Sequence, residues 1–128
     1  MCSPAEATLL VIEDSVTQRQ TVVLTLQKGG YRVIQAGHGL EGLEKLRRHP
    51  EIQAVVCDVE MPQMNGYEFL TACRQDPQLA RLPVIMLTSR SGAKHRDRAF
   101  ALGARDYLTK PCSSQELLAA LGQLEAVR

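Results

Sequence analysis

The chain has 128 residues, of which 45% are hydrophobic and 23% charged, and its formal net charge is +1 at pH 7. We expect one globular domain over residues 1–128, with a flexible N-terminus at 1–7. The near-neutral charge predicts no binding to nucleic acid or to a membrane surface. Because there is neither a bilayer-length apolar stretch nor a signal peptide, we expect a cytoplasmic protein. Four widely spaced cysteines without a C-x-x-C pair predict reduced thiols.

The first apolar run, Thr8–Ile12, contains several β-branched residues and ends in the acidic pair Glu13-Asp14. This composition predicts a buried strand that is followed at once by two carboxylates. Ser15 is the expected N-cap of the next helix, and Gln18 stands where it would complete a capping box. We expect this helix to end at the glycine pair that begins at Gly29.

A second strand is expected at Tyr31–Gln35, followed by an amphipathic helix at Gly39–Arg48 that ends before Pro50. The next apolar run, Ala54–Cys57, is typical of a strand that is buried on both faces, as in parallel sheets. This run ends in a single acid, Asp58. The pattern of the first strand, an apolar run followed by a carboxylate, is therefore repeated.

The second half of the chain continues the alternation. A helix after Gly66 precedes a strand at Pro83–Leu87, and a helix at Gly92–Leu102 precedes a strand at Arg105–Leu108. A last helix begins at a second capping box, Ser113–Glu116. Five such units predict an α/β fold with a parallel five-stranded sheet and helices on both faces, with either flavodoxin-like or Rossmann-like strand order. No G-x-G-x-x-G motif follows the first strand, which argues against dinucleotide binding.

Polar side chains end four of the five expected strands. Because parallel strands end at the same edge of a sheet, we expect Glu13-Asp14, Asp58, Thr88 and Lys110 to converge there. Clustered carboxylates repel one another unless a hard cation lies among them, and Mg²⁺ or Mn²⁺ suits such ligands. The lysine and the threonine would contact a phosphoryl group, and one carboxylate could form an aspartyl phosphate. Each residue alone also fits a capping, turn or surface role.

The motifs around these residues resemble the receiver domains of two-component response regulators. The resemblance extends from Thr8 to about Val127. It implies a doubly wound (βα)5 flavodoxin-like sheet with strand order 2-1-3-4-5, and a single receiver domain. The segments that carry it are Val11–Ser15, Cys57–Pro62 with Asn65-Gly66, Met86–Ser89 and Tyr107–Pro111.

The resemblance also implies roles for individual residues. It implies a Mg²⁺-dependent phosphoryl transfer, in which a sensor histidine kinase or a phosphotransfer domain is the donor. An output protein or domain would bind the face made by the fourth helix, the fifth strand and the fifth helix. The domain would catalyse only its own phosphorylation and dephosphorylation. The implied phosphoacceptor is Asp58, and the implied metal ligands are Glu13, Asp14, Asp58 and the backbone carbonyl of Glu60. Thr88 and Lys110 would contact the phosphoryl group, and Thr88 and Tyr107 would be the switch residues. The Lys110-Pro111 peptide is expected to be cis.

Glu60 and Arg90 stand two residues beyond Asp58 and Thr88, where the two side chains could pair. We hypothesise that this pair limits the access of water to the aspartyl phosphate and so tunes its lifetime; two exposed side chains of little effect are the alternative. The stretch from Pro83 to Pro111 also resembles C-terminal receivers of chemotaxis-type hybrid histidine kinases, which often control motility. The basic run within this stretch, Arg90–Arg96 with Arg98, is interpreted as a solvated helix face.

Two other functions share features with this pattern. A phosphatase similar to haloacid dehalogenases would also use Mg²⁺ and an aspartyl phosphate, but such enzymes carry D-x-D at the first strand, where this chain has Glu13-Asp14. A pseudo-receiver would bind partners without phosphorylation, and the complete set of five site residues argues against it.

Overall fold

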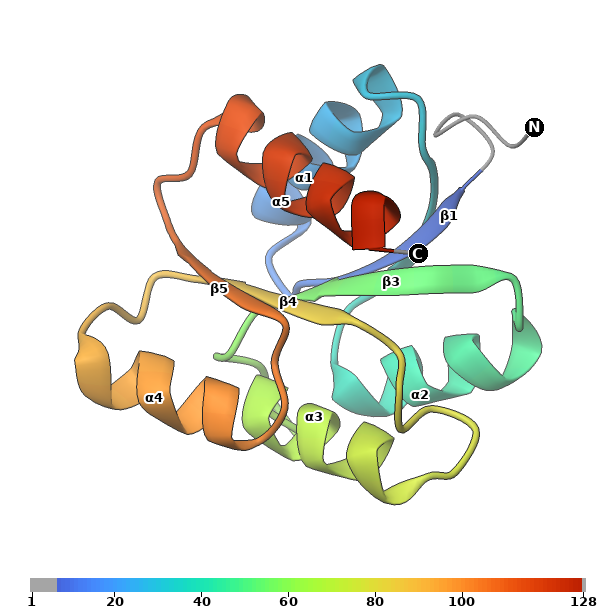
Figure 1. Ribbon diagram of the computed structural model, residues 1–128, viewed down its shortest axis with the longest axis vertical. Helices are drawn as coiled ribbons and strands as arrows, with labels where there is room; N and C mark the ends of the chain where they lie inside the picture. Colours follow the sequence, from blue (N-terminus) through green and yellow to red (C-terminus); the bar gives the residue numbers. More distant parts are fainter. Residues whose placement is uncertain (1–6, 128) are drawn as a thin grey trace.

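The computed structural model describes residues 7–127, which form one parallel sheet and five helices (Figure 1). The alternation of strand and helix that the sequence predicts is present throughout. The strands are β1 (Thr8–Ile12), β2 (Arg32–Ala36), β3 (Ile52–Cys57), β4 (Val84–Thr88) and β5 (Asp106–Thr109). The helices are α1 (Val16–Lys28), α2 (Gly39–Arg48), α3 (Gly66–Gln75), α4 (Ala93–Ala101) and α5 (Ser114–Val127).

The strand order is β2-β1-β3-β4-β5, and all neighbouring strands are parallel. Figure 1 shows α1 and α5 on one face of the sheet and α2, α3 and α4 on the other. This arrangement confirms the doubly wound, flavodoxin-like fold. β1 and β3 are neighbours at the centre, so the acids that follow them leave the sheet side by side.

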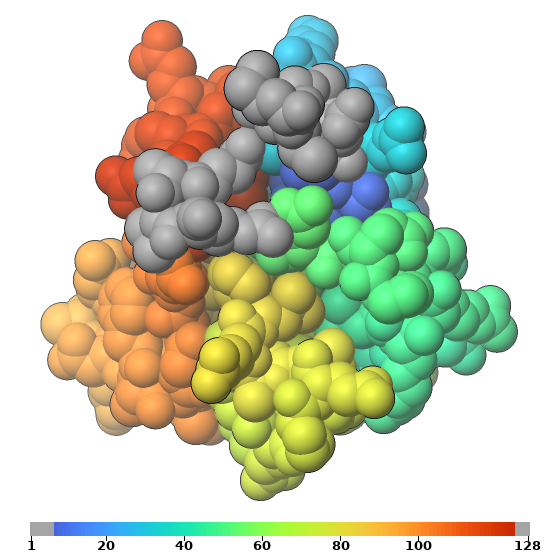
Figure 2. Space-filling model, turned by 45° about the vertical axis from the view of Figure 1, so that its right-hand side comes forward, coloured from blue at the N-terminus to red at the C-terminus, as the bar shows by residue number. Residues whose placement is uncertain are grey.

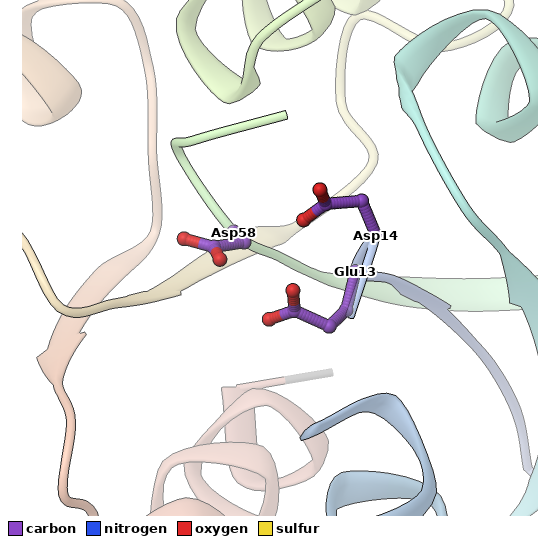
Figure 3. Close-up of side chains that lie close together, drawn as sticks. All are labelled: Glu13, Asp14 and Asp58. Atoms are coloured by element: carbon purple, nitrogen blue, oxygen red, sulfur yellow. The ribbon is translucent and has the colours of Figure 1, made fainter. Parts of the chain in front are cut away.

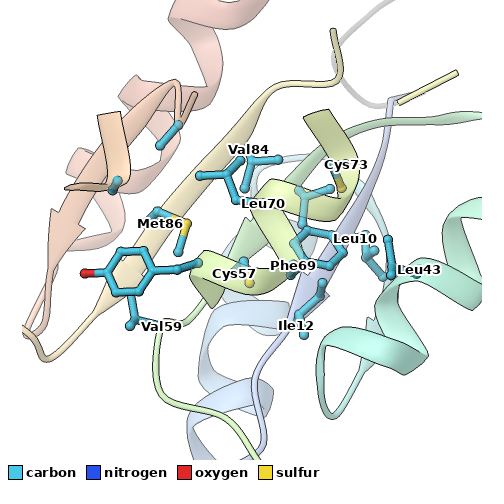
Figure 4. Close-up of a cluster of buried hydrophobic side chains, with 14 of the residues drawn as sticks. Leu10, Ile12, Leu43, Cys57, Val59, Phe69, Leu70, Cys73, Val84 and Met86 are labelled. Atoms are coloured by element: carbon cyan, nitrogen blue, oxygen red, sulfur yellow. The ribbon is translucent and has the colours of Figure 1, made fainter. Parts of the chain in front are cut away.

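Two apolar clusters, one on each face of the sheet, form the core. Leu10 and Ile12 of β1 point to the side of α2 and α3, whereas Leu9 and Val11 point to the side of α1 and α5. Figure 4 shows the first cluster, in which the fully buried Phe69 of α3 packs among residues of the central strands. Because both faces of the central strands are covered, β1, β3 and β4 are apolar at every position except Thr8, Gln53 and Thr88.

Several element boundaries differ from the sequence-based expectation. Tyr31 is not in β2, because its amide donates to the carbonyl of Leu26 and so closes the end of α1 (3.1 Å). β3 begins earlier than expected, at Ile52, which pairs with Thr8 of β1. Leu40 lies in the amphipathic stretch of α2, but it is half exposed.

The expected flexible N-terminus lies outside the described residues except for Ala7. Ala7 is buried and its carbonyl accepts a hydrogen bond from the amide of Arg32 (2.9 Å), so it belongs to the fold. The described cysteines Cys57, Cys73 and Cys112 are free thiols, as expected, and Cys2 lies outside the described residues.

The capping interactions correct one prediction and confirm another. Ser15 accepts from the amide of Gln18 (3.3 Å), but the side chain of Gln18 does not return to Ser15. Instead the carboxylate of Glu13 accepts from the amide of Ser15 (3.0 Å). At α5, Ser113 and Glu116 form the expected capping box. A further capping box, Asn65 with Glu68 at α3, was not predicted.

The two ends of the sheet differ in the residues that lie there. Figure 2 views the molecule from near the end at which β3 and β4 begin, where the segment around residue 50 (green) lies beside that around residue 80 (yellow). A hollow of about 160 Å³ lies between these two segments. The acidic residues are at the opposite end, where the strands finish. Among the described residues, no helix has both the length and the apolar character of a membrane span.

Candidate functional site

Three carboxylates converge where β1 and β3 end. Glu13 and Asp14 follow β1 directly, Asp58 follows β3 directly, and one oxygen of each lies within 4.8 Å of the others (Figure 3). Glu13 and Asp58 are buried, whereas Asp14 is exposed. Two of the three negative charges are therefore largely removed from water, which is unfavourable unless positive charge is near.

Lys110 supplies positive charge from the opposite side of the cluster. Its Nζ lies 2.6 Å from Glu13 Oε1 and 3.3 Å from Asp58 Oδ2, and it also donates to Gln18 Oε1. Burial alone would lower the pKa of Lys110, but the contacts with Glu13 and Asp58 outweigh it, and the net shift is upward. The Lys110-Pro111 peptide is cis, as the resemblance implies.

Glu13 is electrostatically strained in spite of these contacts. Burial raises the pKa of its carboxyl, although Lys110 and the amide of Ser15 lower it; the negative charge of Asp58 adds to the rise. The ionised form of Glu13 is thus incompletely compensated by the protein itself. A bound cation would relieve this imbalance.

The backbone fixes the orientation of Asp58. Its Oδ1 accepts from the amide of Val59 (2.6 Å) and from that of Glu60 (3.4 Å). The loop then folds back, because the amide of Gly66 donates to the carbonyl of Val59 (2.8 Å). A Cβ at Gly66 would lie 2.3 Å from the carbonyl oxygen of Asp58, so only glycine fits there.

Thr88 and Tyr107 lie beside the cluster on the next two strands. Thr88, at the end of β4, is fully buried, and its hydroxyl accepts from the amide of Arg90 (3.2 Å). Tyr107 in β5 is also buried, and its hydroxyl donates to the carbonyl of Arg90 (2.6 Å). Both expected switch residues therefore contact the backbone of the loop between β4 and α4, and the aromatic ring points inward.

Glu60 and Arg90 form the expected pair. The guanidinium of Arg90 lies 2.9 Å from a carboxylate oxygen of Glu60, and Ser89 donates to the other oxygen (3.3 Å). Both charged side chains are about half exposed. The pair links the loop after β3 to the loop after β4.

Three further residues contact the site or its surroundings and were not assigned to it from the sequence. Gln18 was interpreted as a capping residue, but it binds Lys110. Arg19 donates to the carbonyl of Glu13 (2.8 Å) and to the side chain of Gln35 (3.1 Å), so it holds the acidic turn against α1 and β2. Tyr67 donates to the carbonyl of His95 in α4 (3.3 Å). The only signal was that Gln18 and Arg19 lie one helical turn beyond the acids.

The donor set fits a hard divalent cation. All three groups are carboxylates, which Mg²⁺ prefers, and no thiol or imidazole is among them. The exposure of Asp14 leaves one side of the cluster open to water and to a phosphoryl oxygen. Glu13, Asp14 and Asp58 are the residues that would hold the ion.

Comparison with known proteins agrees with this geometry. A model of the family described as the response regulator receiver domain matches residues 9–122. Chemotaxis protein CheY1 of Helicobacter pylori is 36% identical over 110 residues, which cover 85% of this chain and 89% of CheY1. The sensor histidine kinase CheAY of the same organism is 38% identical over 116 residues, but these are 90% of this chain and 14% of CheAY.

Solved structures show the same fold. The chemotaxis response regulator CheY4 of Vibrio cholerae has a TM-score of 0.85 at 36% identity, covering 92% of this chain and 98% of that one. The receiver domain of the sensor histidine kinase PA1611 from Pseudomonas aeruginosa, with a magnesium ion in its active-site cleft, has a TM-score of 0.84 at 26% identity, covering 91% and 95% of the two chains. The chain therefore belongs to the family of response regulator receiver domains, which are signalling modules of two-component systems and not classical enzymes.

Proposed function

We propose that Asp58 is the phosphoacceptor of this receiver domain. The observation that carries the proposal is the position of Lys110, whose ammonium group contacts Glu13 and Asp58 together. A cation in this position can stabilise the negative charge of a phosphoryl group while that group is transferred from a donor to Asp58. The donor would be a phosphohistidine of a sensor histidine kinase or of a phosphotransfer domain.

In the transfer, a carboxylate oxygen of Asp58 attacks phosphorus. A P–O bond forms, the P–N bond to the imidazole breaks, and the imidazole keeps the electron pair and takes a proton from solvent. The amides of Val59 and Glu60 hold Asp58 for the attack, and Lys110 stabilises charge on the phosphoryl oxygens. When bound, Mg²⁺ would neutralise the acids and the phosphoryl group. The carbonyl of Glu60 as an additional ligand stays a prediction.

Two residues connect this event to the surface. Thr88 would turn its hydroxyl from the amide of Arg90 towards the phosphoryl group, which would change the loop that Tyr107 also holds. The affected face contains α4, β5 and α5, and an output protein or domain would bind there. Such a switch is a two-state element that is biased by a charge change at one site.

The pair of Glu60 and Arg90 would control how fast the phosphoryl group is lost. The pair links the loop after β3, which begins with Asp58, to the loop after β4, and it would there limit the access of water to the aspartyl phosphate. One receiver domain over 1–128 is the simplest organisation. The match to a short part of CheAY is compatible with a place in a larger kinase of chemotaxis type.

The deciding experiment is an amide NMR titration with Mg²⁺ and then with beryllofluoride, a phosphoryl mimic, on the wild type and on Asp58→Asn. We expect saturable changes near Asp58, Thr88 and Tyr107 in the wild type and none from beryllofluoride in the variant. Wild-type spectra that do not respond to beryllofluoride would overturn the proposal and favour a module that binds its partners without phosphate.

A further inference from the structure

We propose that Tyr67 forms a second link between the phosphoacceptor loop and α4, separate from the one made by Thr88 and Tyr107. This inference rests on the function proposed above, because it concerns how the state of Asp58 reaches the output face. Tyr67 is the second residue of α3, and its phenol reaches across to α4. Figure 1 shows these two helices on the same face of the sheet.

One end of the link is held tightly to Asp58. Gly66, the residue before Tyr67, donates its amide to the carbonyl of Val59 (2.8 Å). Gly66 packs so closely on the carbonyl of Asp58 that no side chain fits between them. Because close-packed interiors have low compressibility and transmit strain, a displacement of the Asp58–Val59 peptide would shift the start of α3. Tyr67 follows that movement directly.

The other end of the link holds α4 at two points. The hydroxyl of Tyr67 donates to the carbonyl of His95 (3.3 Å), and the guanidinium of Arg98 lies 4.2 Å from the centre of the Tyr67 ring. The first contact is a hydrogen bond to the helix backbone, and the second is a cation–π interaction with a side chain one turn further on. Tyr67 itself is buried, with 5% of its surface exposed.

Among the described residues, α4 is also attached to β5 by a hydrogen bond from the guanidinium of Arg96 to the carbonyl of Tyr107 (3.2 Å), but its buried surface is small. Ala99 is its one buried residue, and its N-terminus at Gly92 lacks a side-chain cap. Gly92 has φ +104°, a backbone conformation that suits a hinge. A hollow of about 290 Å³ lies beside α3 at its contact with α4 and is lined by both Tyr67 and Arg98. A weakly attached helix of this kind can take up two positions at small cost in free energy.

Tyr107 binds a different part of the segment that contains α4. Its hydroxyl binds the carbonyl of Arg90, in the loop before α4, whereas that of Tyr67 binds His95 inside the helix. Tyr107 responds through β4 and β5, and Tyr67 responds through β3 and α3. The two phenols thus donate to two carbonyls five residues apart in the chain, one just before α4 and one inside it. The position of α4 therefore depends on both tyrosines.

The test is hydrogen exchange of the α4 amides, measured by NMR in the presence of Mg²⁺. Spectra without beryllofluoride are compared with spectra that contain it, for the wild type, Tyr67→Phe and Arg98→Gln. Tyr67→Phe keeps the ring and removes only the hydroxyl. We expect the change in α4 exchange caused by beryllofluoride to shrink about three- to tenfold in Tyr67→Phe and less in Arg98→Gln. Amides around Asp58 should still respond fully in both variants.

The matched control is Tyr31→Phe, which removes a phenol hydroxyl from a buried tyrosine on the opposite face of the sheet. It should leave the α4 response unchanged. A wild-type response of α4 in Tyr67→Phe would overturn the inference, as would equal losses in Tyr31→Phe and Tyr67→Phe. If beryllofluoride changes no amides even in the wild type, the proposed function fails as well, so the two failures are distinguishable. Arg98, an exposed residue, provides a variant that keeps the test open should Tyr67→Phe be unstable.

Discussion

Replacing Lys110 by methionine tests whether this lysine compensates the acidic cluster. Methionine keeps most of the volume of the side chain but removes the charge. Glu13 and Asp58, whose side chains are 5% and 9% exposed, then lose their contacts at 2.6 and 3.3 Å. Removing one partner from a buried ion pair costs about 3–5 kcal/mol. Because Lys110 is itself 20% exposed, we expect the lower end, about 3 kcal/mol of unfolding free energy.

The same substitution should make the cluster a better cation site. The ammonium group repels any cation that approaches the three carboxylates, and its removal should raise the affinity for Mg²⁺ on the order of tenfold. Saturating Mg²⁺ should then reduce the stability difference between wild type and variant by about 1.4 kcal/mol. Loss of stability without metal and gain of affinity for metal have one cause, and so they should appear together.

Urea unfolding followed by circular dichroism, with EDTA and then with Mg²⁺, measures both effects. The m-value should be unchanged, so that a shift of the midpoint reports stability. Lys94→Met, which removes an exposed lysine from α4, is the control and should change the unfolding free energy by less than about 0.5 kcal/mol. A Lys110→Met protein as stable as the wild type in EDTA would refute the reasoning, and so would a difference that widens in Mg²⁺.

Three other predictions follow from single contacts. Gln18→Met should slow phosphorylation by a small-molecule phosphodonor several-fold without weakening Mg²⁺ binding, because Gln18 positions Lys110; Gln20→Met on the same helix is the control, and equal rates in both would contradict it. Glu60→Ala and Arg90→Ala should speed loss of the phosphoryl group about two- to fivefold, in keeping with an exposed ion pair, and unchanged decay would end the gating hypothesis. Burial, with the phenol of Tyr67, raises the pKa of Tyr107 from 10.0 to about 12. Between these pH values the folded state keeps a proton that the unfolded chain loses, so the free energy of unfolding should fall as pH rises from about 10 to 12. The fall should be smaller in Tyr107→Phe.

The fold and the acidic cluster could be predicted because their signals are local. Leu9–Ile12 and Ala54–Cys57 are apolar at every position and end in acids, and parallel strands bring such ends to one edge. The register of β1 against β3 then determines that Glu13 and Asp58 meet. Only the strand order itself required the resemblance to a family.

The contacts around the cluster could not be predicted, because they join residues far apart in the sequence. Gln18 and Lys110 are 92 residues apart, and the helical position of Gln18 matched a capping box equally well. Tyr67 and His95 are 28 residues apart, and the contact depends on how α3 and α4 lie on the sheet. An aromatic residue near the start of α3 is compatible with ordinary core packing, so its phenol gave no sign of a partner.

The two tyrosines reach the region of α4 through backbone carbonyls, and this has a consequence for how the proposed output face can vary. Arg90 and His95 offer their carbonyl oxygens to Tyr107 and Tyr67, while their side chains take no part in those hydrogen bonds. Side chains at these two positions can therefore be substituted to suit another partner without removing these two hydrogen bonds, whereas Arg96 and Arg98 contact Tyr107 and Tyr67 through their side chains. A contact made through a side chain, such as that of Arg98 with the Tyr67 ring, ties the choice of partner to the switch. The backbone contacts leave the charge of α4 at an exposed position such as Lys94 free to vary while the response to Asp58 is kept.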